Sequence, residues 1–315
     1  MYCVFGLVMS YKNIKILDLL SSCKICPRKC GVNRLKDEKG FCQAGTEIKI
    51  YNLHLHHGEE PIISGTKGSG TIFFSHCNSR CVFCQNYMFS QLGEGVENSI
   101  DFLADAMLGL QNKGAHNINL VTPTHYSIQI IQAVKIAKEK GLKIPIVYNT
   151  NGYELSEMID LLNGIVDIYL PDMKYNSEES AVKYSSMPGY VSYNRASVKR
   201  MYEQVGELVC EDGIAKRGII IRHLILPNGL SGTRGIMEFI SRELSPNVHM
   251  SLMSQYYPVY NASVHPEINR QITKNEYEEA IDAMEQYGLE NGWIQDAPSD
   301  DDRNTFLGEN FNLNI

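Results

Sequence analysis

Three cysteines lie on one short segment, Cys77-Asn-Ser-Arg-Cys81-Val-Phe-Cys84. Three thiolates on a single loop can bind a metal centre, and no residue of ligand type stands at the spacing that a fourth ligand would require. A [4Fe–4S] cluster normally takes four cysteines. A cluster held by three therefore leaves one iron open to an exogenous ligand, much as a catalytic zinc site keeps one open position. The loop is predicted to hold a metal centre with one free coordination position.

A second group of cysteines precedes this loop, with Cys23, Cys26, Cys30 and Cys42 in the pattern C-x2-C-x3-C-x11-C. Bunched thiols at metal-ligand spacing in a long chain indicate reduced ligands in the cytoplasm, not a disulfide framework. Four thiolates are compatible with a structural zinc ion and with an accessory iron–sulfur cluster, and the sequence leaves both open. Such a site would either staple a small module that lacks a core of its own or relay electrons.

Other candidate residues carry weaker signals. Cys3 and Cys210 stand alone, and Cys210 lies in the apolar run Glu-Leu-Val-Cys, so we expect it to be a buried, unreactive thiol. The segment His56-His57-Gly-Glu-Glu60 is compatible with a metal or proton-transfer site and equally with a solvated turn. His125 and His223 lie at the ends of expected strands, where they would contact a substrate or cofactor, or serve as structural histidines.

The composition excludes several classes of protein. The chain has 315 residues, of which 43% are apolar and 21% charged, as in an ordinary globular protein. A net charge of −7 and the lack of any Lys/Arg-rich block argue against a nucleic-acid partner. Charged or turn residues interrupt every apolar run, so no membrane-spanning segment is expected. The apolar residues 1–8 lack the flanks of a signal peptide, and Met9 is an alternative start.

Apolar runs alternate with segments of helical periodicity beyond Gly70, the pattern of βα units around a parallel sheet. In a doubly wound sheet and in an incompletely closed barrel alike, chemistry lies at the carboxyl ends of the strands, where the cysteine loop and other polar residues follow. Helices are expected over 100–110, 130–137, 155–162, 274–287 and, as a pair, 177–206. Six strands are expected, over 71–75, 117–122, 144–149, 165–171, 218–226 and 248–254.

The cysteine loop follows the first expected strand with the spacing C-x3-C-x2-C, and this resembles the signature of radical S-adenosylmethionine (SAM) enzymes. The segments Asn149-Thr-Asn-Gly152, Asp172-Met-Lys174 and Ile221-Arg222 then follow in the order seen in pyruvate formate-lyase-activating enzymes. From Cys23 onward the chain is similar to uncharacterised paralogues of these activases that carry an added four-cysteine module. The resemblance implies an α/β fold with a partial (β/α)6 barrel at 67–290, a metal module at 1–66 and a tail at 291–315.

The resemblance also assigns roles to the residues of the cysteine loop. It implies that Cys77, Cys81 and Cys84 hold a [4Fe–4S] cluster, while the amino and carboxylate groups of SAM chelate the fourth iron. Phe83, the aromatic residue just before the last cysteine, would contact the adenine of SAM.

Further cofactor contacts follow from the later segments. Asp172 and Lys174 match an Asp-x-Lys pair expected near ribose and carboxylate, and Arg222 matches an arginine that faces the same cofactor. The Gly-Gly-Glu segment that receives the methionyl amino group in the activases is replaced here by Thr122-Pro-Thr124, whose carbonyls and hydroxyls can act as acceptors. Asn149 stands where the activases have an aspartate, so this chain lacks the carboxylate of their monovalent cation site.

The implied chemistry is radical generation. An electron that enters the cluster passes to the sulfonium of SAM and breaks a carbon–sulfur bond, and the resulting 5′-deoxyadenosyl radical abstracts hydrogen from a substrate. The resemblance implies formation of a glycyl radical on a protein substrate, with an electron donor such as flavodoxin or ferredoxin as a partner. Two alternatives stay open: epimerisation or rearrangement of a small metabolite by the same chemistry, and a non-catalytic iron–sulfur electron carrier.

Overall fold

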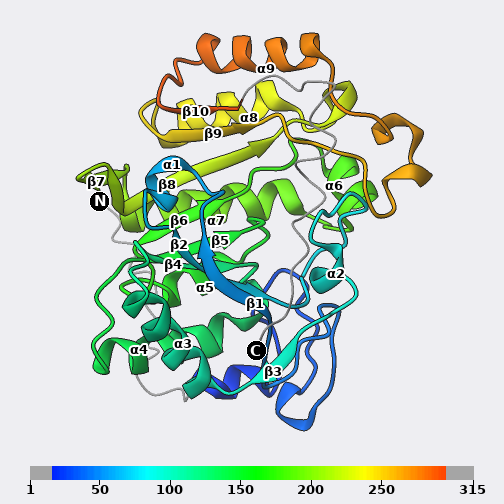
Figure 1. Ribbon diagram of the computed structural model, residues 1–315. Helices are drawn as coiled ribbons and strands as arrows, with labels where there is room; N and C mark the ends of the chain where they lie inside the picture. The colour runs from blue at the N-terminus through cyan, green and yellow to red at the C-terminus, as the bar shows by residue number, and fades with distance from the viewer. Residues whose placement is uncertain (1–15, 296–315) are drawn as a thin grey trace, which may run out of the picture.

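One sheet runs through the protein, with helices packed against it (Figure 1). The computed structural model describes residues 16–295, so residues 1–8, Cys3 and the part of the expected tail beyond residue 295 lie outside the described residues. The strand order is β10-β9-β8-β6-β5-β4-β2-β1-β3, and β7 pairs with β8 beside this path. The two ends of the order, β10 and β3, do not pair with each other within residues 16–295. The sheet is therefore a barrel that does not close.

The centre of the sheet consists of six neighbouring parallel strands, one for each strand expected from the apolar runs. Parallel strands joined by helical crossovers place their carboxyl ends at one edge of the sheet. The α/β class and the partial barrel of six parallel strands are confirmed. The strands are β2 (Ser69–Phe74), β4 (Ile118–Val121), β5 (Ile146–Thr150), β6 (Ile168–Pro171), β8 (Ile214–Leu224) and β9 (His249–Met253).

Four further strands extend the sheet beyond the expected six. β1 (Ile48–His56) runs antiparallel to β2, and β3 (Val96–Asn98) antiparallel to β1. At the other edge, β10 (Gly292–Ile294) runs parallel to β9. β1 lies in the expected module and β10 in the expected tail, so both segments contribute strands to the barrel's sheet. The division into module, barrel and tail stays a prediction.

The fourth additional strand, β7 (Val209–Glu211), forms a hairpin with the start of β8. Its turn contains Asp212 and Gly213 at φ +52° and +74°, as a tight hairpin turn requires. Cys210 is exposed on this strand, so the expectation of a buried thiol is wrong. The reason is that β7 pairs with one strand only and projects beside the main sheet, which leaves its side chains in contact with solvent.

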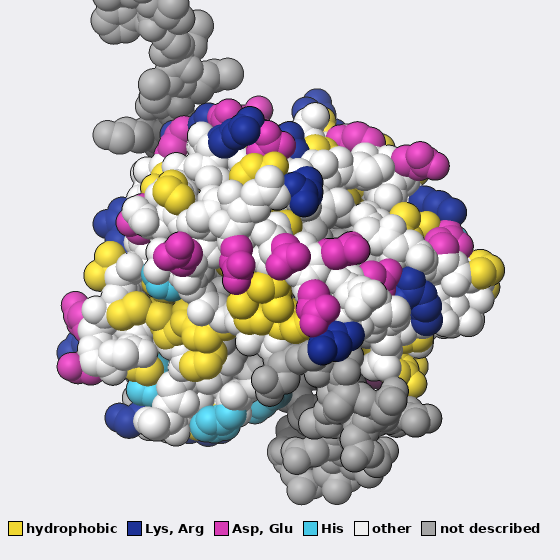
Figure 2. Space-filling view, turned by 90° about the horizontal axis from the view of Figure 1, so that it is seen from above, with side chains coloured by type: hydrophobic (Ala, Val, Ile, Leu, Met, Phe, Trp, Pro, Cys, Tyr) yellow, Lys and Arg dark blue, Asp and Glu magenta, His cyan; other side chains and the backbone are white. Residues whose placement is uncertain are grey.

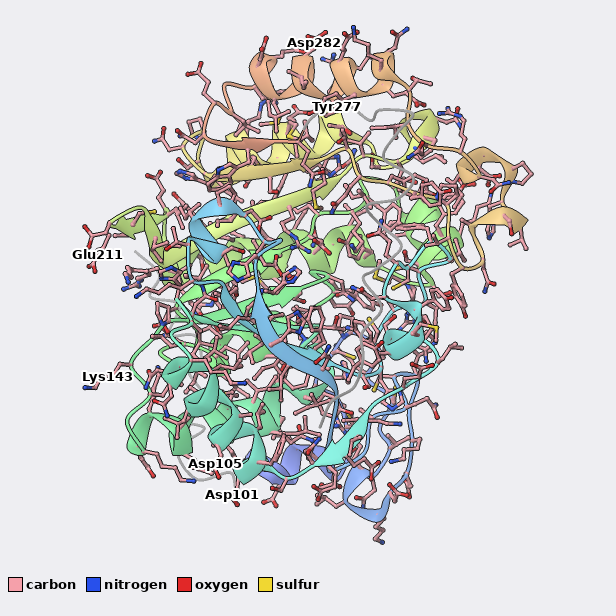
Figure 3. The ribbon with its side chains drawn as sticks, in the orientation of Figure 1. Asp101, Asp105, Lys143, Glu211, Tyr277 and Asp282 are labelled. Atoms are coloured by element: carbon pink, nitrogen blue, oxygen red, sulfur yellow. The ribbon has the colours of Figure 1, made fainter. Side chains whose placement is uncertain are left out.

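The helices confirm the periodic segments, and α1, α2 and α8 are additional helices that the periodicity did not reveal. Ser99 caps α3 by accepting the Phe102 backbone N–H, and the charged residues Asp101 and Asp282 point outward from α3 and α9 (Figure 3). The α-helices are α1 (Pro61–Ser64), α2 (Tyr87–Ser90), α3 (Ile100–Asn112), α4 (Ser127–Glu139), α5 (Ser156–Leu161), α6 (Glu178–Ser185), α7 (Tyr190–Val205), α8 (Thr233–Phe239) and α9 (Lys274–Gln286). Short 3-10 turns cover Ile16–Leu20, Arg34–Lys36, Thr124–Tyr126, Pro227–Gly229, Ala262–Val264 and Pro266–Ile268, and a π turn covers Ile240–Leu244.

The two faces of the sheet bury different sets of side chains. On β5, Ile146 and Tyr148 pack into the large cluster formed with the helices, whereas Val147 between them packs with Ile63 of α1. This alternation follows from the two-residue period of a strand. Each such buried side chain contributes about 1.5–3 kcal/mol of transfer free energy. Because α1 fills the inner side of the sheet, the residues just before it, Glu59 and Glu60, are carried into the interior.

No helix within residues 16–295 combines the length and the apolar character that a membrane-spanning helix needs.

Candidate active site

The three-cysteine loop begins where β2 ends. His76 turns the chain out of the strand at φ +73°, and its backbone N–H donates to the Phe89 carbonyl at 2.8 Å. The thiols of Cys77 and Cys81 are buried and that of Cys84 is half-buried. Each sulfur has a serine hydroxyl close by: Ser79 lies 3.1 Å from Cys77, Ser185 donates to Cys81 at 3.0 Å, and Ser90 lies 3.1 Å from Cys84.

Burial favours the protonated form of the Cys77 and Cys84 thiols in the absence of a positive partner. Burial, together with repulsion from the neighbouring Cys81, raises the pKa of the Cys84 thiol to about 12 and also raises the pKa of Cys77. Thiolates are the form that binds metal, and a bound metal supplies the charge that ionises a buried thiol. Hydroxyl donors around the sulfurs are the kind of contact that tunes an iron–sulfur cluster. The donor set therefore fits a cluster held by three cysteines.

A cavity of about 160 Å³ lies directly against this loop. Its lining contains six of the residues expected from the sequence at the metal centre or the cofactor: Cys81, Phe83, Cys84, Asp172, Lys174 and Arg222. Apolar side chains complete the wall, including those of Leu224, Met253 and Tyr256. The cavity thus joins the loop after β2 to residues at the ends of β6 and β8, which are far apart in the sequence.

The charged residues of the cavity form a continuous network. Lys174 Nζ lies 2.6 Å from Asp172 Oδ2, and Arg222 Nε lies 3.2 Å from Asp172 Oδ1. The same guanidinium reaches Glu59 Oε2 at 3.2 Å through Nη1, and the Asn119 amide donates to Glu59 Oε1 at 2.9 Å. These side chains are 9–20% exposed, so solvent screens them little. Two cations and two carboxylates therefore hold one another in place beside the cavity.

The network determines the charge of its members. Burial pushes the pKa of Asp172 upward, but Lys174 and Arg222 pull it down further, so this carboxyl is ionised. Burial raises the pKa of Glu59 to about 7, and Arg222 opposes that rise only in part. Burial would lower the pKa of Lys174, yet Asp172 holds it above its usual range. The lining of the cavity therefore carries positive charge at Lys174 and Arg222, and behind it the Glu59 carboxyl, whose pKa burial raises to about 7, contacts Arg222.

Glu59 is the residue that sequence reasoning missed. The segment from His56 to Glu60 was equally compatible with a solvated turn, but Glu60 is 8% exposed and Glu59 faces Arg222. The solvated turn is therefore wrong for these two glutamates. The only local signal was Pro61, which begins α1 directly after them.

Three expected cofactor contacts lie outside the lining of this cavity. The Thr122 backbone, at φ +60°, donates to the Asn149 carbonyl at 3.0 Å. Asn149 is buried on β5, and the Thr124 hydroxyl donates to Glu154 Oε1 at 2.6 Å. The roles assigned to Thr122, Thr124 and Asn149 stay predictions. Glu154 was not singled out in the sequence.

His223, one of the two histidines expected at strand ends, and Tyr256, which lines the cavity, are both buried and hydrogen-bonded. His223 is buried, with Nδ1 2.7 Å from the Met173 carbonyl and Nε2 2.9 Å from the Thr233 hydroxyl. Tyr256 packs edge-on against Phe83 at 5.5 Å, and its hydroxyl donates to the Ile268 carbonyl at 2.7 Å. Tyr256 therefore fixes the Phe83 ring at the cavity wall.

The N-terminal cysteines also come together. Cys23, Cys26, Cys30 and Cys42 line one pocket, together with Arg34 and His125. Within residues 16–295, no three His, Cys, Asp or Glu side chains stand close enough to share a single metal ion. A zinc ion requires such convergence, whereas each cysteine of an iron–sulfur cluster binds a different iron. Zinc and iron–sulfur both remain open for these four thiols.

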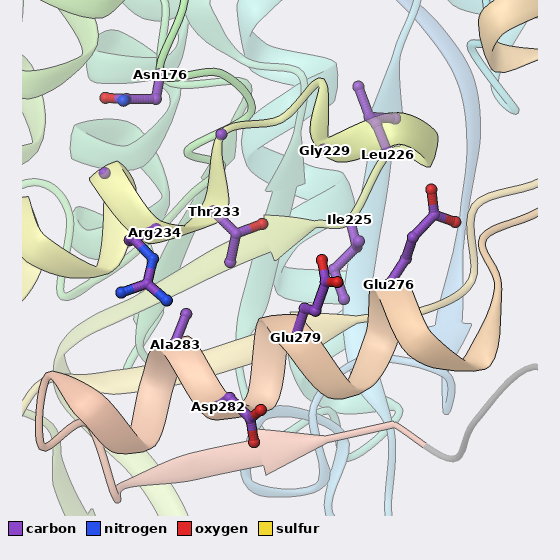
Figure 4. A pocket seen from close by; sticks show the side chains of 12 residues that line it. Asn176, Ile225, Leu226, Gly229, Thr233, Arg234, Glu276, Glu279, Asp282 and Ala283 are labelled. Carbon is purple, nitrogen blue, oxygen red and sulfur yellow. The ribbon is translucent and has the colours of Figure 1, made fainter.

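A larger cavity, of about 600 Å³, lies between α8 and α9 (Figure 4). Its labelled side chains include Thr233 and Arg234 from α8 and Glu276, Glu279 and Asp282 from α9. Glu276 contacts Arg270, which lowers the pKa of the carboxyl to about 2. The same side chain also takes part in the N-terminal capping box of α9. This cavity contains no cysteine and shares no residue with the charged network, so the chemistry lies at the smaller one.

The chain is similar in sequence to known proteins over most of its length. The sequence profile of the Radical SAM superfamily matches residues 71–228. The uncharacterized protein MJ0674 of Methanocaldococcus jannaschii is 34% identical over 282 residues, which cover 87% of this chain and 77% of that protein.

Similar solved structures were also found. HydG from Carboxydothermus hydrogenoformans, a FeFe-hydrogenase maturase, aligns with a TM-score of 0.46 and 14% identity over 68% of this chain and 49% of its own. Methylornithine synthase, PylB, aligns with a TM-score of 0.42 and 15% identity over 69% of this chain and 62% of its own. The chain thus spans about half the length of HydG.

Proposed function

This chain belongs to the radical SAM superfamily, whose members cleave SAM with an iron–sulfur cluster, and on that premise we propose that it generates a radical for hydrogen abstraction from a protein substrate. The observation that carries the proposal is the cavity in which Cys81 and Cys84 meet Asp172, Lys174 and Arg222. An electron carrier has no use for a cavity lined by fixed charges beside its metal centre.

Different residues in and beside the cavity would bind the cluster and SAM. Cys77, Cys81 and Cys84 would hold the cluster, and the two cations Lys174 and Arg222 are suited to the carboxylate of SAM. When bound, the cluster and SAM together would supply a 5′-deoxyadenosyl radical. Asp172 keeps both cations in position, because it contacts each of them at 3.2 Å or less.

The apolar wall protects a reactive species. Phe83, Tyr256, Leu224 and Met253 line the cavity and keep water away from the reacting atoms. The Phe83 ring, braced by Tyr256, is the flat apolar surface on which an adenine would stack.

A protein substrate is supported by the surface beside the cavity. The segments 82–92 and 256–264 lie side by side, because the Asn261 backbone N–H donates to the Val82 carbonyl at 2.8 Å and Tyr87 stacks on Tyr260 at 4.9 Å. Leu92 and Val264 on these segments are 60% and 69% exposed. The same two segments contribute residues to the lining of the cavity, and exposed apolar side chains beside a functional cavity are typical of a protein-binding surface. The glycyl-radical activity implied by the sequence resemblance needs such a surface.

SAM cleavage is the first test. Anaerobically reconstituted protein, reduced with dithionite, should convert SAM into 5′-deoxyadenosine and methionine, and Cys81→Ala should abolish the conversion. Cys210→Ala is the matched control, because that thiol is exposed on β7 and should leave turnover unchanged. No turnover in wild-type protein with a full complement of iron would support the electron-carrier alternative.

Isotope transfer tests the substrate class. Deuterium from a glycine-labelled glycyl radical enzyme should appear in 5′-deoxyadenosine, and Leu92→Asp should raise the KM for that protein without changing uncoupled SAM cleavage. Deuterium transfer from a labelled metabolite pool, with none from protein, would support the metabolite alternative.

A further inference from the structure

The N-terminal four-cysteine pocket lies directly against the loop that carries Cys77, Cys81 and Cys84. Arg28, next to the pocket, donates through Nε to the Asn78 carbonyl of that loop at 3.0 Å. Its guanidinium lies 3.6 Å from the centre of the Phe41 ring, and the guanidinium of Arg80, from the loop, lies 4.6 Å from the same centre. Phe41 immediately precedes Cys42. One aromatic ring of the module is therefore held by an arginine from each metal site.

Three hydrogen bonds, joined through Phe41 and Arg80, connect the two sets of cysteines. The Phe41 backbone N–H donates to Cys30 Sγ at 3.5 Å, and the Phe41 carbonyl accepts from Arg80 Nη2 at 2.6 Å. Arg80 Nη1 then donates to the carbonyl of Cys77 itself at 2.9 Å. The backbone of Phe41, through its two successive peptide groups, and the guanidinium of Arg80 thus link a sulfur of the first site to a cysteine of the second.

The module is also fixed to the barrel from its other side. Arg34 is 1% exposed and donates to the Gly45 carbonyl at 2.9 Å and to the His125 carbonyl at 2.7 Å. The His125 ring in turn contacts the Ser75 carbonyl at 2.8 Å, just before the cysteine loop. Buried charge-assisted contacts of this kind hold the two sites at a constant separation.

We propose that the four-cysteine site is a second iron–sulfur site that passes single electrons to the three-cysteine site, with Arg80 as the positioning residue that connects them. This inference rests on the proposed function, which needs one electron for each SAM cleaved. A low-potential one-electron carrier protein is oxidised by one electron, the four-cysteine site accepts it, and the three-cysteine site receives it in turn. That electron is consumed when the carbon–sulfur bond of the sulfonium breaks.

The surface of the module indicates where the electron enters. Between Cys23 and Cys42 there are six basic and two acidic residues, although the whole chain has a net charge of −7. Cys30 is exposed, and so are Lys24 and Lys29 near it. At the opposite end of the molecule lies α9, on which Glu278 and Asp282 are exposed (Figure 1). The face seen from above carries a row of acidic side chains (Figure 2). This asymmetry steers an acidic carrier protein to the module.

Metal content of the full-length wild-type protein is the first measurement. We expect about eight irons per chain, four at each site, and no zinc. In Cys77→Ala/Cys81→Ala/Cys84→Ala protein, about four irons should remain and give an electron paramagnetic resonance signal on reduction. About four irons and one zinc in wild-type protein would overturn the inference, while leaving dithionite-driven SAM cleavage, and hence the proposed function, intact.

The connection through Arg80 is tested by comparing two reductants. Reduced flavodoxin serves as the carrier protein, and dithionite is small enough to reach the three-cysteine site directly. In Arg80→Gln the ratio of flavodoxin-driven to dithionite-driven SAM cleavage should fall about tenfold, a typical loss for residues that support metal ligands. General damage to the loop would lower both rates of SAM cleavage alike and would therefore leave their ratio unchanged.

Arg28→Gln is the matched control, because it loosens the same interface and leaves the Arg80 contacts to Phe41 and Cys77 in place. Its ratio should stay close to that of the wild type. An unchanged ratio in Arg80→Gln, or the same fall in both variants, would overturn the role of Arg80. No SAM cleavage with dithionite in iron-replete wild-type protein would instead contradict the proposed function.

Discussion

Replacement of Glu154 by glutamine tests the electrostatics of the barrel interior. The Glu154 carboxyl is 1% exposed, and its Oε1 accepts from the hydroxyls of Thr124 and Thr150, each at 2.6 Å. Oε2 is buried and has no hydrogen-bond partner among the described residues. Glutamine keeps the size of the side chain and an oxygen acceptor for both threonines, but it does not ionise. The substitution therefore removes the charge and places the amide NH2 at the position of Oε2.

The magnitude follows from the pKa. Burial raises the pKa of Glu154 from 4.5 to about 7, and the hydroxyl donors oppose this rise only in part. The folded chain therefore holds the proton more tightly than the unfolded chain. The associated stability is fully present below pH 4.5 and is lost as the pH rises to about 7. The loss amounts to about 3 kcal/mol of unfolding free energy. The Glu154→Gln variant does not show this loss, because glutamine does not ionise.

Thermal unfolding of wild-type and Glu154→Gln protein, measured anaerobically at pH 5 and pH 8, reads out this difference. We expect nearly equal Tm values at pH 5 and a Tm about 5 °C higher for the variant at pH 8. Glu59, whose pKa burial also raises to about 7, titrates in both proteins and cancels in the comparison. Glu157→Gln, an exposed carboxyl on α5, is the control and should shift neither value. A variant that melts lower than wild type at both pH values would refute the reasoning.

Three further substitutions test the site and its support. Asp172→Asn leaves Lys174 and Arg222 without their carboxylate in a poorly solvated position, so the free energy of unfolding should fall by about 3 kcal/mol in denaturant titrations; a loss below about 1 kcal/mol would mean that water screens these pairs. Lys174→Met should raise the KM for SAM about tenfold, the value of one charge-assisted hydrogen bond, and an unchanged KM would remove Lys174 from the cofactor site. Gly152 has φ +72°, and a Cβ there would lie 2.5 Å from the Asp172 carbonyl oxygen. Gly152→Ala should therefore cost at least about 1 kcal/mol more than Gly164→Ala, where φ is +75° and the space is open, and equal costs would rule out the close contact.

The parts of the fold that depend on local pattern were predictable. The six parallel strands follow from short apolar runs, and α3, α4 and α9 from helical periodicity, because both patterns repeat within a single element. The strands of the antiparallel edge and β10 were not predicted. β1, β3 and β10 exist through pairing with partners elsewhere in the chain, and pairing of this kind leaves little trace in a short, half-exposed segment.

The residues of the candidate site were predictable where a sequence motif marks them, and were missed where only packing places them. Asp172, Lys174 and Arg222 do meet at the cavity beside the cysteine loop. Glu59 was missed because its position depends on α1: Ile63 packs against the inner side of the sheet and draws the preceding glutamates inward. Nothing in the residues from His56 to Glu60 encodes that packing.

Covalent spacing alone determined that three thiols share one loop and that four more stand ahead of them, since neighbours in sequence cannot be far apart in space. Which residues face these thiols was decided only by the tertiary structure. Arg80 meets Phe41 across a separation of 39 residues, and Arg222 meets Glu59 across 163. Contacts over such distances depend on how the strands are ordered in the sheet and how its inner side is filled, and both are properties of the whole folded chain.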